Sequence, residues 1–572
     1  MIPYLDQNLL QTNTSSSKNA IVRFVGMVQD ILDVEYYHTQ VQGRYTKYQE
    51  HDDRTDPCHD DLFLESIDSS MDYGERQPLI LVPIPFTSPW FQQSLLNHHR
   101  QSISTQDRQD DTIHHSKRYK RNSNLIWPTG IMESDSSQSA VLAKMYHHDY
   151  DHNSTNTRHV RLNDIVEIVG IVCKNHGALD EEEMKVQGSD IAYRSPYHYN
   201  TEELIHPLDM QDESNTIIPE IQHAYNQLTH VHVLYYKVID MDSRIDPTSF
   251  VQYSEFTSRL CNTFEQDRSL AIETFTSYIF NGDTNAAEVL LLSLMSMAER
   301  DKYQNSIHLP DGATLGCASL QLIVPTVEAG HWVRTRLIHM LKMIMPVVAC
   351  IDVTEHSLES PKESYLSIPE KIGTRLGPTS IQLPKGSCMI VDECKLDAEI
   401  RSQGYSSLTA LSRIARDHCV GYNFHGIPFD FETDYVVIVI SKEDDEEDMG
   451  DDDNVTFSGC TLRYRLTQLG DRLSSLPVVS DLVASRIRSY MRLCRKRDAI
   501  SLSDQDLLSK AQNDFINRRN VRTTDTKPPV DEEDFHRWLT MTRLFARSHF
   551  KTAATSEDWE SSLRLDAAIK NQ

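Results

Sequence analysis

The sequence contains little glycine or proline, no Cys-x-x-Cys pair and no long apolar run. Its 20 glycines and 22 prolines among 572 residues exclude collagen-like and low-complexity chains. Its 10 cysteines stand singly, which predicts a reduced, intracellular protein without a structural zinc site. The apolar stretches at 289–292 and 343–351 are far shorter than the ~20 residues of a membrane helix. The first residues lack the basic and apolar parts of a signal peptide.

Basic residues are also scarce relative to acidic ones. Lys and Arg number 56 against 84 Asp and Glu, so the formal net charge is −28. A surface this acidic repels phosphate backbones, and we therefore do not expect duplex binding through net charge. The hydrophobic share of 39% still leaves enough apolar mass for globular cores. At ~150 residues per domain, the length predicts three or four domains, or two with long connections.

The first part of the chain has the pattern of short strands separated by polar segments. The predicted strands are Ile21–Val28, Leu79–Pro83, Val141–Tyr146 and Asp164–Val172. Gly26 and Gly170 stand in the middle of two of them, and such glycines are typical of a bend in a small curved barrel. Residues 98–138 are too polar to form a core and are expected to be a disordered linker, with 174–217 as a second linker.

From about residue 218, helical patterns alternate with continuous apolar runs. This arrangement is typical of a mostly parallel sheet that is buried on both faces. The predicted strands are Leu320–Val324, Val347–Val353, Cys388–Val391 and Tyr435–Ile440, and the predicted helices are Ala271–Phe280, Ala286–Ala298, Val333–Met345 and the whole stretch from Leu482 to the end. The arginines that follow Leu482 are interpreted as a solvated helix face, with a nucleic-acid groove as the alternative. Residues 443–453 hold nine acids in eleven positions, which predicts a surface loop that either binds a basic partner or is simply solvated.

Two features suggest an ATPase whose nucleotide loop has lost its chemistry. Gly282–Asp283 precedes a buried helix, where a GxxxxGK[ST] loop would cradle phosphates. Counted from that glycine, the Lys and Ser/Thr positions hold Glu288 and Val289, so a carboxylate would repel the triphosphate and no hydroxyl could bind Mg²⁺. The second feature is Asp392–Glu393 after an apolar strand, where ATPases hold Mg²⁺ and polarise water. Solvated acids at a strand end are the alternative. We therefore predict no catalytic, cofactor-binding or metal-binding residue, and no cofactor.

The order of these features resembles an AAA-type ATPase core followed by its helical lid. Gly282–Glu288 resembles the nucleotide loop of minichromosome-maintenance (MCM) replicative helicases with the lysine lost, and Ser489–Arg492 and Phe535–Phe550 resemble parts of their lid. The combination is similar to one family in particular, the MCM complex-binding proteins. The segments that carry this resemblance follow the family's order: Val22–Asp33 with Glu35–Tyr37, Arg76–Trp90, Asn163–Gly170, Gly282–Leu292 and Ile390–Glu393.

Together with the strand pattern, the resemblance implies a multidomain α/β protein. It would have an N-terminal OB-like β-barrel region, a degenerate AAA-like (MCM-like) α/β domain and a C-terminal helical lid. The expected parts are the β-rich segment 1–97, the disordered linker 98–138, the remaining barrel strands 139–173, the linker 174–217, the AAA-like domain 218–480 with its acidic loop 443–453, and the lid 481–572. In the family an extension precedes the segment like Ile2–Leu5. Either that extension is dispensable or this sequence is truncated.

For function, the resemblance implies a nuclear protein without catalytic activity that binds MCM helicase subunits. In the family such a protein acts as a chaperone in the assembly and stability of the MCM complex, in its unloading from chromatin during DNA replication, and in sister-chromatid cohesion. It would associate with chromatin through MCM, without strong direct DNA binding and without a membrane. The basic run Ser116–Arg121 is a candidate nuclear import signal.

Two other functions remain open. A single-stranded-nucleic-acid-binding OB-fold replication factor needs a basic groove with stacking aromatic residues. Tyr36, Tyr37 and Tyr45 could stack, but residues 49–75 are acidic. An active AAA ATPase would need a nucleotide loop elsewhere in the chain. No Gly-Lys-Ser/Thr sequence occurs, and Lys385–Ser387 carries the residues in the wrong order.

Overall fold

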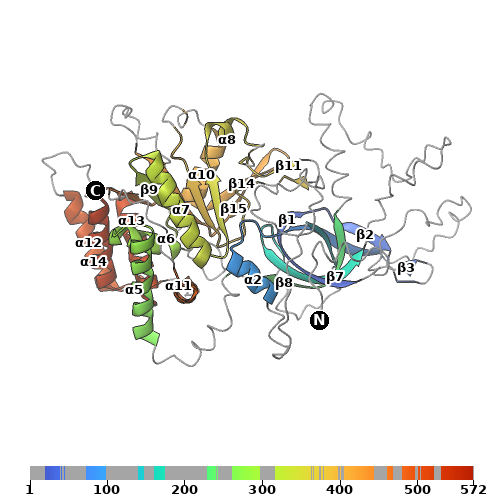
Figure 1. The fold of residues 1–572 in the computed structure, drawn as a ribbon, viewed down its shortest axis with the longest axis horizontal. Coiled ribbons are helices and arrows are strands. Elements are labelled where there is room, and N and C mark those ends of the chain that lie inside the picture. The colour runs from blue at the N-terminus through green and yellow to red at the C-terminus, as the bar shows by residue number, and fades with distance from the viewer. Residues whose placement is uncertain are drawn as a thin grey trace, which may run out of the picture. The chain divides into compact units, whose positions relative to one another are not determined.

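The computed structural model describes residues 20–38, 40–41, 44–45, 73–97, 140–146, 160–173, 228–239, 241, 260–296, 316–362, 364, 366–372, 375–377, 379–396, 400, 405–443, 460–467, 479–495, 500–502, 504–520 and 530–570. The predicted linkers 98–138 and 174–217, the basic run Ser116–Arg121 and the acidic run after Glu443 lie outside these residues. The chain divides into two compact units (Figure 1). The first comprises 1–84, 106–238 and 372–376, and the second 85–105, 239–371 and 377–572.

The first unit contains a sheet that closes on itself. Its strands lie in the order β1, β7, β8, β6, β5, and a further pairing of β5 with β1 completes the ring. The strands are β1 (Ile21–Ile31), β5 (Tyr73–Val82), β6 (Val141–Tyr146), β7 (Ile165–Cys173) and β8 (Thr229–Ile239), with β2 (Glu35–His38) added beside β5. β1 runs antiparallel to β5 and β7, and β5 to β6, whereas β6 and β8 are parallel. The short strands β3 (Gln40–Val41) and β4 (Arg44–Tyr45) form a separate ribbon.

Gly26 and Gly170 lie where neighbouring strands come close together. A Cβ at Gly26 would overlap a carbonyl oxygen of β5, and a Cβ at Gly170 would overlap a carbonyl oxygen of β8. The irregularity in the register of β1 with β5 lies further along, between Val28 and Asp30. Close strand packing therefore requires these glycines, whereas the sequence predicted a bend at each.

The second unit is built on a five-stranded parallel sheet with helices packed against it (Figure 1). The strands lie in the order β10 (Val348–Asp352), β13 (Cys388–Asp392), β16 (Val436–Lys442), β9 (Leu320–Val324) and β17 (Leu462–Arg465), and every neighbouring pair is parallel. The predicted apolar runs coincide with the first four, and Leu322, Ile390 and Ile438 are fully buried. The predicted mixed α/β class is therefore confirmed, and so is the parallel sheet.

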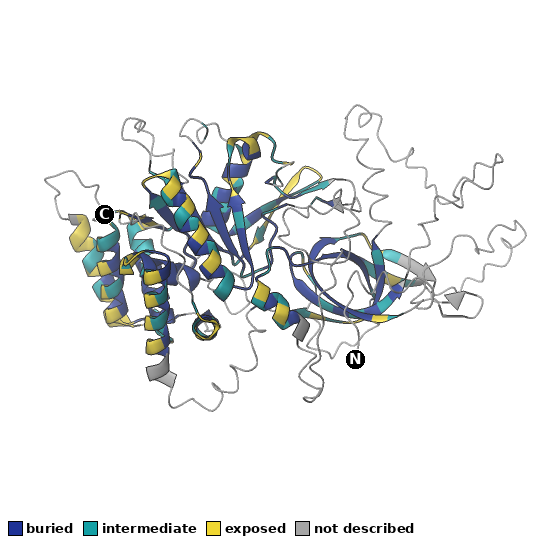
Figure 2. Cartoon of the chain, viewed as in Figure 1, coloured by how far each residue is buried: buried dark blue, intermediate teal, exposed yellow. Residues whose placement is uncertain are grey.

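The C-terminal helices share a hydrophobic core with this sheet. The helices before or between the strands are α5 (Leu260–Tyr278), α6 (Thr284–Leu294), α7 (Val327–Ile344), α8 (Glu355–Glu359) and α10 (Ser406–Asp417), and those after them are α11 (Asp481–Arg495), α12 (Gln505–Asn520), α13 (Glu532–Ser548) and α14 (Ser556–Lys570). The common core includes Trp538 and Trp559, both fully buried. Figure 2 shows buried residues along the strands of the sheet and exposed residues on the outer sides of the helices. Residues 481–572 thus belong to the same compact unit, where the sequence predicted a separate lid domain. Among the helices that the structure describes, none is long and apolar enough to cross a membrane.

Three segments lie in the unit opposite to the predicted one, and the shortest of them is 372–376, which belongs to the first unit. β8, expected within the domain 218–480, pairs with β6 in the first unit. Helix α2 (Pro89–Asn97), expected within 1–97, belongs to the second unit. There Ser88 donates its backbone N–H and its hydroxyl to the carbonyl oxygens of Pro346 and Met345 at 2.8 and 2.5 Å. The boundaries differ because an apolar pattern reports burial and not the element that a segment pairs with.

The second unit also carries a smaller sheet that the sequence did not predict. Its strands are β11 (Glu370–Ile372), β14 (Cys419–Phe424) and β15 (Ile427–Glu432). β11 is parallel to β14, and β14 and β15 form an antiparallel hairpin. The short strand β12 (Arg375–Leu376) belongs to the first unit. The sequence analysis missed β15 although Ile427, Phe429 and Phe431 stand at alternate positions, because the strand is short, contains Pro428 and is mostly exposed.

Candidate functional site

The Gly282–Asp283 turn and the Asp392–Glu393 pair both lie in the second unit. The turn does not have the surroundings of a nucleotide loop. In a P-loop fold, the phosphate-binding loop joins a strand to a helix. Here the Gly282–Asp283 turn joins helix α5 to helix α6. Strand β9 does lead into a helix, α7, but only Pro325 and Thr326 lie between them. That connection is too short to form a GxxxxGK[ST] loop.

The N-terminus of α6 is capped by the chain's own carboxylate. Asp283 accepts a hydrogen bond from the Ala286 N–H at 3.0 Å. The Tyr464 hydroxyl of β17 lies 2.8 Å from each of the two Asp283 carboxylate oxygens. Gly282 makes this turn possible, because its φ of 107° is unfavourable for other residues. A helix N-terminus attracts an anion, and Asp283 already supplies one.

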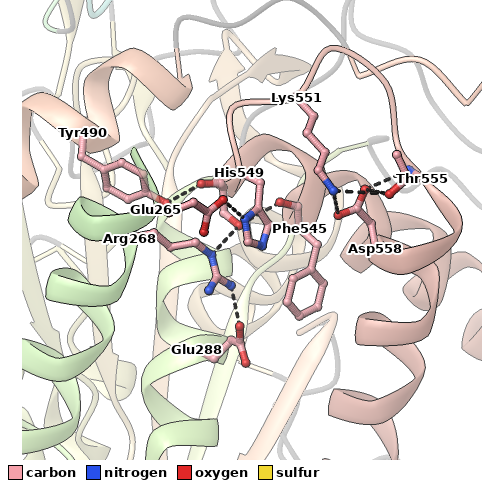
Figure 3. Close-up of polar contacts among 10 residues, drawn as sticks. Glu265, Arg268, Glu288, Tyr490, Phe545, His549, Lys551, Thr555 and Asp558 are labelled. Carbon is pink, nitrogen blue, oxygen red and sulfur yellow. Dashed lines mark hydrogen bonds and ion pairs between the residues drawn. The ribbon is translucent and has the colours of Figure 1, made fainter. Parts of the chain in front are cut away.

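Glu288 and Val289, the positions where a nucleotide loop carries Lys and Ser/Thr, have structural contacts. The Glu288 carboxylate pairs with the Arg268 guanidinium of α5 at 2.5 Å (Figure 3). Arg268 Nε also donates to the Ser548 hydroxyl of α13 at 3.1 Å. Val289 is fully buried in the core. Glu288 therefore helps to join three helices and does not face an open phosphate-binding loop.

Further polar contacts beside Arg268 join the C-terminal helices to α5 and to one another (Figure 3). His549 Nδ1 lies 2.6 Å from the Glu265 carboxylate, and the Tyr490 hydroxyl of α11 donates to the Ser548 carbonyl at 2.7 Å. Burial raises the pKa of Tyr490 well above its ordinary value, so this hydroxyl keeps its proton. These contacts consequently stabilise the packing of α11 and α13 on α5.

At the carboxyl end of the parallel sheet, Arg334 lies between two aspartates. Asp352 ends β10 and Asp392 ends β13, and these strands are neighbours. The guanidinium of Arg334, on α7, pairs with Asp352 at 2.5 Å and with Asp392 at 3.4 Å. Burial disfavours its charge, but Cys350 and the two aspartates outweigh burial and raise the pKa of Arg334 above the usual value. An internal cation therefore neutralises the strand-end acid that would face Mg²⁺ in an ATPase.

Glu393 and Cys394 pack into the same edge of the sheet. Glu393 accepts a hydrogen bond from the Ser441 hydroxyl of β16 at 2.6 Å. That hydroxyl lies 2.9 Å from the side-chain amide of Gln321 on β9. Cys394 packs against the first turn of α7, because a Cβ at Gly330 would come within 2.5 Å of its Sγ. Side chains of β9, of β16 and of the residues after β13 thus pack together where an ATPase would bind its nucleotide.

Burial overturns one of the two sequence interpretations of the acidic pair Asp392–Glu393. The residues are 9% and 1% exposed, so they are not solvated acids at a strand end. The partners described for them, Arg334 and Ser441, are protein groups. In the part of the chain that the structure describes, no group of three or more His, Cys, Asp or Glu side chains is arranged to hold a metal ion.

The arginines of α11, predicted to form a solvated face, are largely used in packing. Arg495 is 3% exposed and donates to a backbone carbonyl of α6 at 3.0 Å, and Arg492 is 8% exposed. Arg486 forms an ion pair with the buried Asp267 of α5. The predicted solvated face is therefore wrong for Arg492 and Arg495, which are buried, whereas the Arg486 side chain is 46% exposed.

Comparisons with known proteins find relatives with one shared name along almost the whole chain. The sequence matches the family described as mini-chromosome maintenance replisome factor over residues 1–126 and 97–572. A relative from Danio rerio, named mini-chromosome maintenance complex-binding protein, is 22% identical over 612 residues, which cover 96% of this chain and 88% of the relative. The protein of the same name from Arabidopsis thaliana is 22% identical over 611 residues, covering 100% and 90%. That from Salmo salar is 23% identical over 601 residues, covering 96% and 87%.

Proposed function

The chain belongs to the mini-chromosome maintenance replisome factor family, and from this membership we propose that it is a non-catalytic binding factor for MCM helicase subunits. Its relatives are named for binding the mini-chromosome maintenance complex. In the proposed role the protein is a chaperone in MCM assembly and stability, in unloading of MCM from chromatin during DNA replication, and in sister-chromatid cohesion. The similarity supports this role because it extends over both compact units.

In this proposal the second unit is a degenerate AAA-like body. Numbered along the chain, its parallel strands lie in the order 5-1-4-3-2, which is the order of AAA-type ATPase cores. The acidic pair Asp392–Glu393 stands at the end of the third strand. A body of this kind can pack beside a true MCM ATPase domain, because it offers the surfaces of a related subunit.

One observation supports the proposal that the protein is not catalytic. The chain's own groups occupy the positions where an ATPase would bind the nucleotide phosphates and Mg²⁺. In the strand order above, the phosphate loop would lie between β9 and α7, and only Pro325 and Thr326 connect these two elements. Arg334 of α7 neutralises Asp392 at the strand end. MgATP would have to displace this guanidinium and leave a buried carboxylate without its partner, at a cost of about 1–3 kcal/mol.

The first unit is proposed to be an OB-like barrel. Along the chain, its ring has the strand order 1-2-3-5-4, with the third and fifth strands parallel. The OB-fold is a five-stranded Greek-key barrel that binds oligonucleotides in many proteins. Single-stranded nucleic acid is therefore the second candidate ligand, and Tyr235, 58% exposed on β8, favours it as a stacking surface. The net charge of −28 opposes it.

Surface capture of purified MCM subcomplexes on the full-length protein tests the main proposal. We expect direct, saturable binding, and we expect no heat when MgATP is titrated into the free protein. An unrelated protein of similar negative charge is the control for non-specific attraction. If no MCM subcomplex binds above this control, the binding function is refuted. A low-micromolar affinity for MgATP would instead refute the non-catalytic part. Micromolar binding of a fluorescent single-stranded oligonucleotide would favour the second candidate.

A further inference from the structure

The hairpin of β14 and β15 has a geometry that is set by its turn. His425 and Gly426 connect the two strands, and their φ values are 52° and 85°. Two positive φ values in a two-residue loop match the twist of paired strands. The turn therefore fixes the register, which places Tyr422 opposite Phe429 and Phe424 opposite Ile427.

One face of this hairpin is aromatic and apolar from base to tip. Side chains alternate along a strand, so the residues at 420, 422 and 424 share a face with those at 427, 429 and 431. On β14, Tyr422 is 1% exposed, whereas Ile427 and Phe429 on β15 are 59% and 49% exposed. The exposed fraction thus rises across this face from β14 to β15.

Ring contacts link the exposed Phe429 to half-buried Phe424, and half-buried Phe431 to buried Tyr422. The rings of Phe424 and Phe429 meet edge to face with centroids 5.5 Å apart. Tyr422 and Phe431 meet in the same way at 4.7 Å. An exposed aromatic side chain that is already ordered loses little entropy when a partner covers it. Such aromatic groups are the usual energetic centres of protein interfaces.

The edge of β15 is unsuited to the addition of another strand. β15 is the last strand in its sheet, and its second residue is Pro428. The pair next to a two-residue turn is hydrogen-bonded and the next pair is not, so Pro428, opposite Asn423, faces the free edge. Pro428 has no N–H to offer there. A partner is therefore expected to cover the apolar face, not to extend the sheet.

The charge around the hairpin indicates the chemistry of its partner. Asp430 and Glu432 lie on the opposite face of β15, by the alternation of its side chains. The side chain of Asp430 is 50% exposed, although it pairs with Arg413 at 2.7 Å. The chain as a whole carries −28. Complementarity favours a partner surface that is apolar at its centre and basic around it.

We propose that the tip of this hairpin, Ile427 and Phe429 supported by Phe424 and Phe431, inserts into an apolar pocket with a lysine- and arginine-containing rim on a folded MCM subunit. The inference rests on the proposed binding function and names the element that carries it. The exposed Ile427 and Phe429 side chains suit an apolar pocket, and Pro428 excludes strand addition as the main mode.

The test is surface capture of a purified MCM subcomplex on the full-length protein and on the double variant Ile427→Ser/Phe429→Ser. We expect the dissociation constant to rise by about 30-fold or more, as for interface residues that contribute about 2 kcal/mol. The matched control is Leu482→Ser, because Leu482 is 74% exposed on α11. The control should change the dissociation constant by less than about twofold. All variants should keep the native melting temperature, since the replaced side chains are exposed.

Different outcomes separate this inference from the function on which it rests. If the native protein binds no MCM subcomplex, the proposed function fails. If the native protein binds and the double variant binds equally well, the function stands and the hairpin is not the interface. Should the double variant melt early, Ile427→Glu at the most exposed position of the tip repeats the test, and unchanged affinity would again overturn the inference. Binding that weakens equally in Leu482→Ser would also overturn it.

Discussion

Replacing Arg334 by methionine tests whether an internal guanidinium stabilises the carboxyl end of the parallel sheet. The variant keeps most of the apolar stem and removes the charge. In the native protein this charge lies 2.5 Å from Asp352 and 3.4 Å from Asp392. The Asp392 side chain is 10% exposed and that of Asp352 is 49% exposed. The variant therefore leaves one buried and one half-solvated carboxylate without their shared counter-charge.

The two contacts contribute unequally. The contact with half-exposed Asp352 is screened by water and contributes less than about 1 kcal/mol. A hydrogen bond to a buried charged group contributes about 1.5–3 kcal/mol, and the 3.4 Å separation from Asp392 places that contact at the lower end. We expect the free energy of unfolding to fall by about 2 kcal/mol in total. For a large domain this corresponds to a fall in melting temperature of about 4 °C.

Thermal unfolding of the full-length protein, followed by tryptophan fluorescence, measures the effect. Trp538 and Trp559 report on the second unit because both lie in its core. The matched control is Arg413→Met, which removes a comparable ion pair with Asp430 at 2.7 Å from a site where the side chains are 43% and 50% exposed. The control should cost less than about 0.5 kcal/mol. Equal melting temperatures for the two variants would refute the role assigned to Arg334.

Four further predictions follow from the same contacts. Glu288→Lys restores the lysine of a nucleotide loop, yet calorimetry should detect no MgATP binding because Asp283 still caps α6; micromolar affinity would contradict this. Burial lowers the pKa of His418 from 6.5 to about 4, so its contribution to stability is present above pH 6.5 and is lost as the pH falls toward 4, by about 3 kcal/mol. The urea midpoint of unfolding should vary less with pH in His418→Asn, a variant that suits the left-handed φ of 53° at this position. An unchanged pH dependence in this variant would show that His418 is not its source. Deleting residues 481–572 should unfold the second unit because its core is shared, and a native-like melting transition in that truncation would show otherwise. We propose a nuclear location, and replacing the basic residues of Ser116–Arg121 by alanine should move a fluorescent fusion to the cytoplasm; unchanged nuclear signal would mean that import does not depend on this run.

The apolar pattern of the sequence determined the main elements of the second unit. β9 coincides with its predicted strand, and β13 extends its predicted strand by one residue, Asp392. Such agreement is expected because a strand buried on both faces needs an uninterrupted apolar run. The mismatch with a nucleotide-loop motif was equally visible, since Glu288 stands where the motif counted from Gly282 requires lysine. The family followed from the order of the matching segments, which does not depend on how they pack.

Only the tertiary structure decided what each element meets. Arg334 carries no sequence signal for its role, because an arginine on an amphipathic helix has the same pattern beside water or beside two aspartates. The cap of α6 joins Asp283 to Tyr464 across 181 positions, and the assignment of β8 to the first unit depends on its pairing with β6. A one-dimensional pattern reports whether a residue is buried. The partner of a buried or charged group depends on which distant segments pack together, and that is settled only in the folded chain.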